Sequence, residues 1–490
     1  MSDIILVYPA MTDAKNPHGS VLPLCFAWIA SLLEKNGISV KIIDLQIEDI
    51  NLSELLRKED PLCVGVSGTT QSRFNSFKII EEVKTINKDI ITLYGGPHAT
   101  PTAEDTLNHV SALDVVIRNE GEITVLEIMK ALKKSRRVDF SKILGISFRE
   151  KERIIHNQTR PFLRNLDELP MPAWHLFKMD HYKQELDYIN LPGHVILTSR
   201  GCPYNCSFCS ARLLWKCHYS RRSASNVADE LEHLVDRYSI KGFKIFDSTF
   251  TISRNHVLSI CNEINRRNLD YLRWECEIRA DTVDRELLKK MKTAGCYYVD
   301  VGLESASSRV RRAISKGITL QQVENVIDWC NELGLLVKLF ITWGHPTETY
   351  KEALQTYRFV EKYRNKVYRM AAHVGIMIYP GTDVEKFARQ QGYLAPNFSW
   401  SKPYYEIANV NLGSDPQVPL LIQHQMQYKH LARINFKLHW SPLLNLPNIF
   451  RKLVELFFKK DLRKKHINTL IELFNQRFNR NIQTLERNAS

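Results

Sequence analysis

The sequence lacks any run of about 18 consecutive apolar residues, which a membrane-spanning helix requires. Its first ten residues do not show the pattern of a signal peptide, and its 10 cysteines in 490 residues do not form the dense framework of a disulfide-stabilised secreted domain. A composition with 44% hydrophobic and 25% charged residues is ordinary for a globular protein of two or three domains. We therefore expect a cytoplasmic protein without a membrane span.

Two phosphate-binding motifs are also missing. No G-x-G-x-x-G turn follows the first apolar segment, and no Walker-type G-x4-G-K occurs. These absences argue against NAD and ATP as ligands.

The net charge of +13 is unevenly distributed. Residues 420–490 hold 13 Lys and Arg against 4 Asp and Glu, which leaves 54 basic and 50 acidic residues, a net +4, for residues 1–419. The positive field therefore belongs to the C-terminal region, and the charge does not indicate a specific nucleic-acid partner for the body of the chain.

Residues 1–135 alternate short apolar runs with helical patterns. The expected strands are 3–9, 38–45, 62–68, 89–96 and 113–121. Five strands separated by helices predict a doubly wound parallel sheet, in which ligands bind beyond the carboxyl ends of the strands. Glycines in the loops at 67–71, 95–100 and 118–122 would let the backbone approach a large flat group, although turn glycines often serve structure alone.

Residues 136–190 change character and are expected to link two domains. They contain a charged loop, a hairpin pattern at 142–157 and a proline-broken connector at 166–177. We interpret Trp174 in the connector as a core side chain.

Residues 191–410 repeat strand then helix six times. The expected strands are 194–199, 242–247, 272–278, 296–302, 336–344 and 371–379, and helices should begin near Ser223, Ser253, Asp284, Thr319 and Thr349. Ser225 and Asp284 are expected to cap two of these helices. A closed β/α barrel has eight strand–helix units, so six units predict a partial barrel, with its chemistry at the carboxyl ends of the strands.

Cys202, Cys206 and Cys209 show the spacing Cys-x3-Cys-x2-Cys directly after the first barrel strand. A closed zinc site needs four ligands, and no second cysteine pair appears downstream. Three thiolates can each bind one iron of a [4Fe–4S] cube and leave the fourth iron open for a ligand. The remaining barrel cysteines lack ligand spacing and are expected in the core, with Cys276 as the one that could face a substrate.

This cysteine loop, with Phe208 before the third cysteine, resembles that of the radical S-adenosylmethionine (SAM) superfamily. The resemblance implies that SAM binds the open iron and is cleaved reductively to a 5′-deoxyadenosyl radical. Polar residues at the barrel ends match family motifs, except that Thr347 stands where glycine is usual. The residues implied in SAM binding are Phe208, Asp247, Ser248, Arg279, Glu304, Ser305, Gly344 and Pro346.

The N-terminal region, placed before such a barrel, resembles the cobalamin-binding domain of class B radical SAM enzymes. Asn119 stands where the family often has glycine, and no Asp-x-His-x-x-Gly sequence supplies a lower axial histidine. The resemblance therefore implies cobalamin without a histidine on cobalt. The residues implied in cobalamin binding are Ser67, Gly68, Thr69, Gly95, Gly96, Pro97, His98, Glu120, Gly121 and Glu122.

Residues 411–490 are expected to form a basic helical region. In residues 448–465 apolar side chains can share one helical face while Lys and Arg crowd elsewhere. Such a helix could lie on an anionic membrane surface, or pack against the barrel with a solvated basic face.

Taken together, residues 1–410 resemble the group of enzymes that contains the anaerobic magnesium-protoporphyrin ester cyclase and cobalamin-dependent methyltransferases. The resemblance implies methylation of an unactivated carbon of a small-molecule or lipid substrate, with electrons from a donor such as flavodoxin or ferredoxin. Two alternatives stay open: a radical cyclase or oxidase without methyl transfer, and a non-catalytic protein that binds cobalamin and a cluster. The sequence does not identify the substrate or any catalytic residue.

Overall fold

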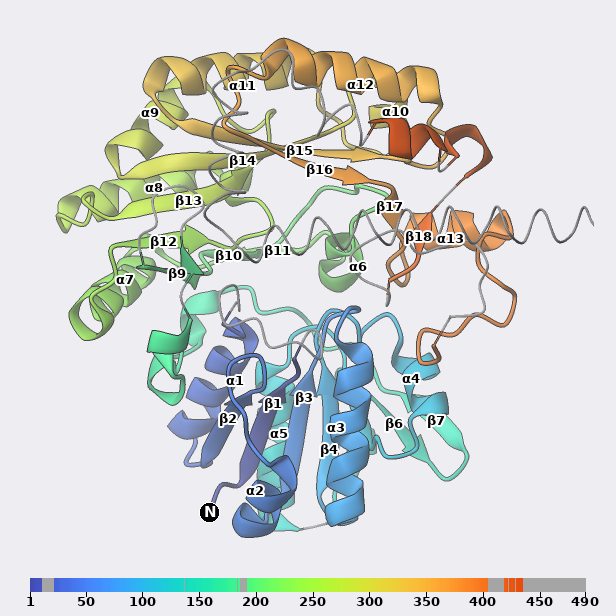
Figure 1. Ribbon diagram of the computed structural model, residues 1–490. Helices are drawn as coiled ribbons and strands as arrows, with labels where there is room; N and C mark the ends of the chain where they lie inside the picture. Colours follow the sequence, from blue (N-terminus) through green and yellow to red (C-terminus); the bar gives the residue numbers. More distant parts are fainter. Residues whose placement is uncertain are drawn as a thin grey trace, which may run out of the picture. The chain divides into compact units, whose positions relative to one another are not determined.

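The computed structural model describes residues 1–10, 22–135, 137–182, 184–185, 192–403, 418–421, 423–427 and 429–434 (Figure 1). Residues 1–431 form one compact unit. The region expected at 411–490 lies mostly outside the described residues, and the amphipathic segment 448–465 lies wholly outside them. Within the described ranges, no helix is both long and apolar enough to cross a membrane.

The first sheet has seven strands in the order β2-β1-β3-β4-β5-β6-β7. Strands β1 to β5 are parallel, which confirms the predicted doubly wound sheet. The order 2-1-3-4-5 places a topological switch point between β1 and β3, where such sheets bind ligands. The bounds of the five parallel strands are Ile4–Tyr8 (β1), Val40–Asp44 (β2), Cys63–Ser67 (β3), Ile91–Gly95 (β4) and Val115–Ile117 (β5).

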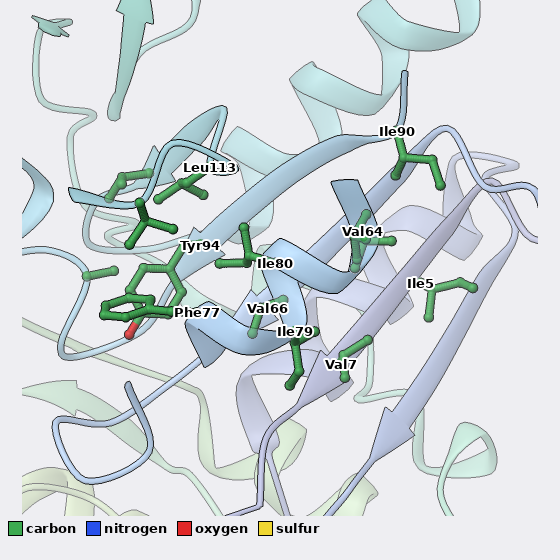
Figure 2. Packing of buried hydrophobic residues seen from close by; sticks show 14 of the residues in the cluster. Ile5, Val7, Val64, Val66, Phe77, Ile79, Ile80, Ile90, Tyr94 and Leu113 are labelled. Carbon is green, nitrogen blue, oxygen red and sulfur yellow. The ribbon is translucent and has the colours of Figure 1, made fainter. Parts of the chain in front are cut away.

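Helices cover both faces of this sheet. One face packs against α2, α3 and α4, because alternate strand residues such as Ile5, Val7, Val64 and Val66 point toward the side chains of α3 (Figure 2). On the strands' other face, α1 packs against α5. The helix bounds are Leu24–Lys35 (α1), Leu52–Glu59 (α2), Arg73–Ile86 (α3), Ala103–His109 (α4) and Glu122–Lys134 (α5).

The hairpin expected in the connecting segment extends the first sheet. Strands β6, Ile146–Glu150, and β7, Arg153–His156, are antiparallel, and β6 pairs with β5. These residues therefore add to the N-terminal sheet instead of standing between two domains. Trp174 is buried with 1% of its side chain exposed, as expected of a core residue.

The second sheet carries the six strands predicted for the barrel. These six strands are parallel. The first, β9, and the last, β16, do not pair with each other, so the strands form an open arc (Figure 1). A short strand β8, Gln184–Glu185, pairs antiparallel with β9. The bounds of the six are Pro192–Ile196 (β9), Gly242–Ile245 (β12), Arg273–Ile278 (β13), Cys296–Glu304 (β14), Leu336–Trp343 (β15) and Arg369–Val374 (β16).

The barrel helices begin where their capping residues predict. Ser223, Ser253, Asp284, Thr319 and Thr349 each accept a backbone N–H of the first turn, and the last two form full capping boxes. The prediction that Ser225 caps was wrong, because Ser223 takes that position and Ser225 lies within the helix. The bounds are Ala224–Tyr238 (α7), Arg254–Arg266 (α8), Arg285–Thr293 (α9), Ser308–Ala313 (α10), Leu320–Leu333 (α11), Tyr350–Tyr363 (α12) and Asp383–Gln390 (α13).

Candidate active site

The three spaced cysteines lie on the loop between β10, Ser199–Gly201, and α6, Ala211–Trp215. Strand β10 pairs antiparallel with β11, Tyr219–Arg221, which closes the loop at its base. Gly201 has a φ of +84°, and a β-carbon there would lie 2.1 Å from the carbonyl oxygen of His218. Only glycine fits at the base of the cysteine loop.

The cysteine loop suits a polynuclear cluster. In the part of the chain that the structure describes, no group of three His, Cys, Asp or Glu side chains could hold a metal ion. In a cube, however, each thiolate binds a different iron, so three sulfurs need not converge on one point. Burial raises the pKa of the Cys209 thiol to about 11 and also raises that of Cys206. Bound iron would offset this effect, since a coordinating thiol is deprotonated.

Lys316 is a residue of this site that sequence reasoning missed. Its ammonium lies 2.9 Å from the Glu304 carboxylate, both side chains are buried, and its charge acts to lower the pKa of Cys206. A β-carbon on Gly302 would lie 2.5 Å from the Lys316 nitrogen and 2.6 Å from Glu304. Gly302 thus makes room for a cation beside the thiolates, and a lysine in a loop carries no signal of this in the sequence.

Arg279 is held beside the cysteine loop. Its guanidinium donates to both oxygens of Asp281 at 2.9 and 3.0 Å and to the Lys316 carbonyl at 2.7 Å. It also lies 3.5 Å from the ring centre of Tyr204, which stands between the first two cysteines. The Arg-Ala-Asp sequence therefore orients a cation against the loop.

Asp247 has protein partners for its carboxylate. It accepts from the Thr198 amide at 2.8 Å and from the Thr198 and Ser199 hydroxyls at 2.6 Å each. Burial raises the pKa of this carboxyl. Asp247 thus fixes the end of β9 and the start of β10, while its neighbour Ser248 is exposed.

Ser305, at the end of β14, is fully buried and lies within hydrogen-bond distance of Thr356 at 3.2 Å. Glu304 before it has a φ of +63°, in a register irregularity of β14. The left-handed backbone turns two consecutive side chains toward different partners, which places Glu304 on Lys316.

His345 stands out in the loop after β15. Its ring is fully buried, neither ring nitrogen has a hydrogen-bond partner, and its centre lies 5.6 Å from that of Phe208. Burial lowers the pKa of His345 to about 4, so the ring is neutral. A buried polar group normally has a partner, so this ring marks a position suited to a bound ligand beside Phe208. Gly344, before it, has a φ of +93°, and Pro346, after it, is half-buried.

Glu348 holds this loop in place and leads to a pH prediction. Its carboxylate accepts from the amides of Gly344 at 2.7 Å and His345 at 3.3 Å, and burial raises its pKa to about 7.

Because the folded-state pKa of Glu348 lies above the unfolded one, Glu348 favours folding below about pH 4.5, and this contribution is lost as pH rises through 7. Glu348→Gln should remove the loss, about 3 kcal/mol, and urea midpoints at pH 5 and pH 7.5 measure it.

Glu263→Gln on α8 is the matched control for this prediction. The guanidinium groups of Arg266 and Arg267 lower the pKa of Glu263 to about 2, so its contribution is lost only as pH falls through 2. Its effect on the urea midpoint should therefore be the same at pH 5 and pH 7.5. An equal pH dependence in both variants would contradict the assignment of the titration to Glu348.

The interior face of the barrel carries opposite charges. Lys244 lies 3.1 Å from Glu275 and 3.2 Å from Asp300, and Lys338 lies 3.6 Å from Asp300. Burial and the charge of Asp300 raise the pKa of Glu277 to about 7. Glu277 can therefore exchange a proton near neutral pH at this face.

The prediction that Cys276 could face a substrate was wrong. Cys276 is fully buried, and its thiol interacts with that of Cys296 on β14. It alternates along β13 with Glu275 and Glu277, so it points to the opposite face, toward the helices.

Loops that follow β3, β4 and β5 meet at one edge of the first sheet. Gly96 has a φ of +99°, and a β-carbon there would lie 2.8 Å from the Ser67 hydroxyl and 2.9 Å from the Gly68 carbonyl. A β-carbon on Gly68 would lie 2.4 Å from the Ser76 hydroxyl. Gly96 is thus required for packing between the loops and Gly68 for packing of its loop against α3, whereas a β-carbon on Gly95 would meet nothing closer than 3.7 Å.

His98 lies in the second of these loops and is fully buried. Its Nδ1 lies 3.2 Å from the Thr70 hydroxyl, its Nε2 has no partner, and its ring meets Trp400 edge-on at 6.1 Å. Burial and the nearby Arg73 hold its pKa well below the usual value. This neutral ring with an unpartnered nitrogen fits contact with a ligand at the sheet edge.

Arg200 joins the first sheet to the cysteine loop. It donates to Glu120 at 2.8 Å and to Glu122 at 2.6 Å, and all three side chains are at most 7% exposed. Its guanidinium also lies 5.6 Å from the Trp28 ring. The two carboxylates, which the resemblance implies in cobalamin binding, are engaged by Arg200, and Gly121 between them packs against Ile29.

The loops at the two sets of strand ends also contact each other elsewhere. Gln71, after β3, donates to the Tyr379 hydroxyl at 3.1 Å. A doubly wound sheet thus presents its ligand edge to a partial barrel that holds a three-cysteine loop. This combination defines a radical SAM enzyme with an attached cobalamin-type domain, and the residues present fit both groups.

Comparisons with known proteins agree with this class. Residues 196–360 match the Radical SAM superfamily, and residues 14–129 match the B12 binding domain. The chain is 34% identical over 404 residues to an uncharacterized methyltransferase of Pyrococcus horikoshii. The aligned residues make up 81% of this chain and 85% of that protein. It is 27% identical over 350 residues to the anaerobic magnesium-protoporphyrin IX monomethyl ester cyclase of Rubrivivax gelatinosus, covering 69% of this chain and 62% of that protein.

A solved structure shares the fold. The cobalamin-dependent S-adenosylmethionine radical enzyme OxsB, with aqua-cobalamin and S-adenosylmethionine bound, superposes with a TM-score of 0.71 at 18% identity, over 90% of this chain and 66% of that chain. This chain belongs to the cobalamin-dependent radical SAM methyltransferase family. Its cofactors are a [4Fe–4S] cluster, SAM and cobalamin.

Proposed function

We propose that this enzyme transfers a methyl group to an unactivated carbon of a small-molecule or lipid substrate. The observation that carries the proposal is the direct contact between the two cofactor regions, in which Arg200 beside the cysteine loop binds Glu120 and Glu122 at the ligand edge of the first sheet. Bound SAM supplies a radical that takes a hydrogen atom from carbon, and bound cobalamin supplies the methyl group. Both groups must reach one carbon, so their sites have to adjoin.

Individual residues take the following proposed roles. Cys202, Cys206 and Cys209 would hold the cluster, and Arg279, Glu304 and His345 would contact SAM. Lys316 offsets the negative charge of the thiolates. The loops with Ser67, Thr69, Pro97 and His98 receive cobalamin. Gly68 and Gly96 shape the loops of the first sheet through their protein contacts, and Asp247 and Ser305 do the same for the loops of the barrel.

Incubation of the reconstituted holoenzyme tests the function. The anaerobic protein, loaded with iron, sulfide and hydroxocobalamin, is given SAM with a deuterated methyl group, dithionite and fractionated cell extract. Methyl transfer predicts 5′-deoxyadenosine and S-adenosylhomocysteine together, with label in one fraction. Label in the lipid or the polar fraction would distinguish the two substrate classes.

The same assay separates the alternatives. If every fraction of the extract gives 5′-deoxyadenosine and none gives S-adenosylhomocysteine, methyl transfer is contradicted and a cyclase or oxidase is favoured. Absence of both products from a protein that retains its cluster and cobalamin would favour a binding protein. Protein loaded with the cluster alone is the control, because it should cleave SAM without transferring label.

The partners and location follow from this chemistry. A low-potential donor such as flavodoxin or ferredoxin would reduce the cluster in the cytoplasm. A basic C-terminal region could hold the enzyme at the inner membrane surface near a lipid substrate. Sedimentation of the full chain with vesicles that contain anionic lipid tests this contact.

A further inference from the structure

A cavity of about 570 Å³ opens at α10 and the loop that leads to α11. It lies outside the residues assigned to the cluster, SAM and cobalamin. Hydroxyl groups and two guanidinium groups line it, and no acidic residue does. The polar side chains of the lining are those of Ser308, Arg311, Arg312, Ser315 and Thr319.

The positive charge in this cavity is not neutralised by carboxylates. Arg311 donates to two backbone carbonyls, Ile318 at 3.1 Å and Ser305 at 2.8 Å. Arg312 is exposed and has no ion pair among the described residues. Burial and the charge of Arg312 lower the pKa of Arg311, as expected when two cations lie together without a counter-ion.

The loop that forms one wall of the cavity rests on the cysteine loop with its other side. The amide of Ser207, next to Cys206, donates to the carbonyl of Ile314 at 3.0 Å. Lys316 follows two residues later and points inward to Glu304. One layer of backbone, residues 314–316, therefore separates the cavity from the cysteine loop.

The geometry points to this cavity as the docking site of an acidic one-electron carrier protein. Complementary charge would guide and orient the carrier, because interfacial charge mainly sets the association rate and the specificity. A carrier seated over the exposed Arg312, with the buried Arg311 adding positive charge beneath it, brings its redox group to within one layer of backbone of the cysteine loop. Electrons could then enter the cluster through residues 314–316 and the neighbouring Ser207.

The transfer is a simple exchange of charge. The carrier is oxidised by one electron and the cluster is reduced by one, and no bond is made or broken. The inference rests on the cluster alone and not on methyl transfer. It therefore stays testable if the proposed methylation fails, because SAM cleavage and carrier binding are measured without a substrate.

Charge reversal at Arg312 tests the docking site in the holoenzyme. Arg312→Glu is compared with Lys289→Glu, which reverses an exposed charge in the middle of α9. Production of 5′-deoxyadenosine is measured twice, with reduced flavodoxin as donor and with dithionite, which needs no docking surface. At low ionic strength, we expect the rate with flavodoxin divided by the rate with dithionite to fall about tenfold in Arg312→Glu and less than twofold in Lys289→Glu.

Binding of oxidised flavodoxin to the holoenzyme, followed by calorimetry, gives a second readout that needs no turnover. Arg312→Glu should weaken binding, and added salt should weaken binding to the wild type more than to the variant. Equal affinities of wild type and variant would overturn the proposal. An equal loss with both reductants would also overturn it, because it would place Arg312 in SAM binding. Binding of inorganic phosphate without any binding of the carrier would overturn it too, because it would indicate a small-anion site.

Discussion

Replacing Cys206 with serine is expected to remove the iron–sulfur cluster and to lower SAM cleavage on the order of a thousandfold or more, as loss of one member of a catalytic unit does. Cys206 is the most buried of the three cysteines of the loop. The backbone that follows Cys206 is fixed, since the Ser207 amide donates to the Ile314 carbonyl and the Cys209 amide donates to the Cys206 carbonyl at 3.1 Å. A serine hydroxyl is a poor iron ligand and cannot take the place of the thiolate.

Cys217→Ser provides the matched control. Cys217 is exposed and lies after α6, eight residues beyond the last cysteine of the loop. It should keep iron, sulfide and SAM cleavage at the wild-type level. The assay measures iron and sulfide per chain, the visible absorption of the cluster and the yield of 5′-deoxyadenosine. A full iron content in Cys206→Ser, or an equal loss in Cys217→Ser, would contradict the assignment of the cluster ligands.

Local signals in the sequence were enough to predict the fold. All five residues of strand β3 are buried and only the last, Ser67, is polar, as expected of a parallel strand covered on both faces. Thr319 and Thr349 each precede Gln or Glu by three residues, which is the sequence signature of a capping box. Both features depend on neighbours in sequence, so no tertiary information was needed.

Other features depend on contacts between distant residues, and the sequence did not reveal them. Lys316 reaches Glu304 over twelve positions, and Arg200 reaches Glu122 over 78. The hairpin of β6 and β7 reads as an independent unit until its pairing with β5 is seen. Gly68 and Gly96 read as openings for a ligand, but their loops pack on each other. Burial and pairing decide these cases, and neither has a signature within a short segment.

Replacing Arg200 with methionine is the second large effect that we expect. Methionine keeps most of the apolar volume but leaves Glu120 and Glu122 buried together without a cation. Breaking a buried ion pair by removal of one partner lowers stability by about 3–5 kcal/mol. Burial already raises the pKa of Glu120 even with Arg200 beside it. The urea midpoint of the apoprotein measures the loss. Arg221→Met is the control, because Arg221 is exposed on the neighbouring strand β11.

A combined variant shows whether the loss comes from unpaired charge. Arg200→Met together with Glu120→Gln and Glu122→Gln leaves no buried charge at this contact, and it should regain most of the lost stability, since an ion pair replaced as a whole is often neutral for stability. Cobalamin retention should not recover in parallel if Arg200 is what holds the loop after β5 against β10. Recovery of stability without recovery of cobalamin binding would assign Arg200 to the joint between the two cofactor regions. Equal midpoints for Arg200→Met and Arg221→Met would contradict that role, because the contact would then contribute no more than a surface hydrogen bond.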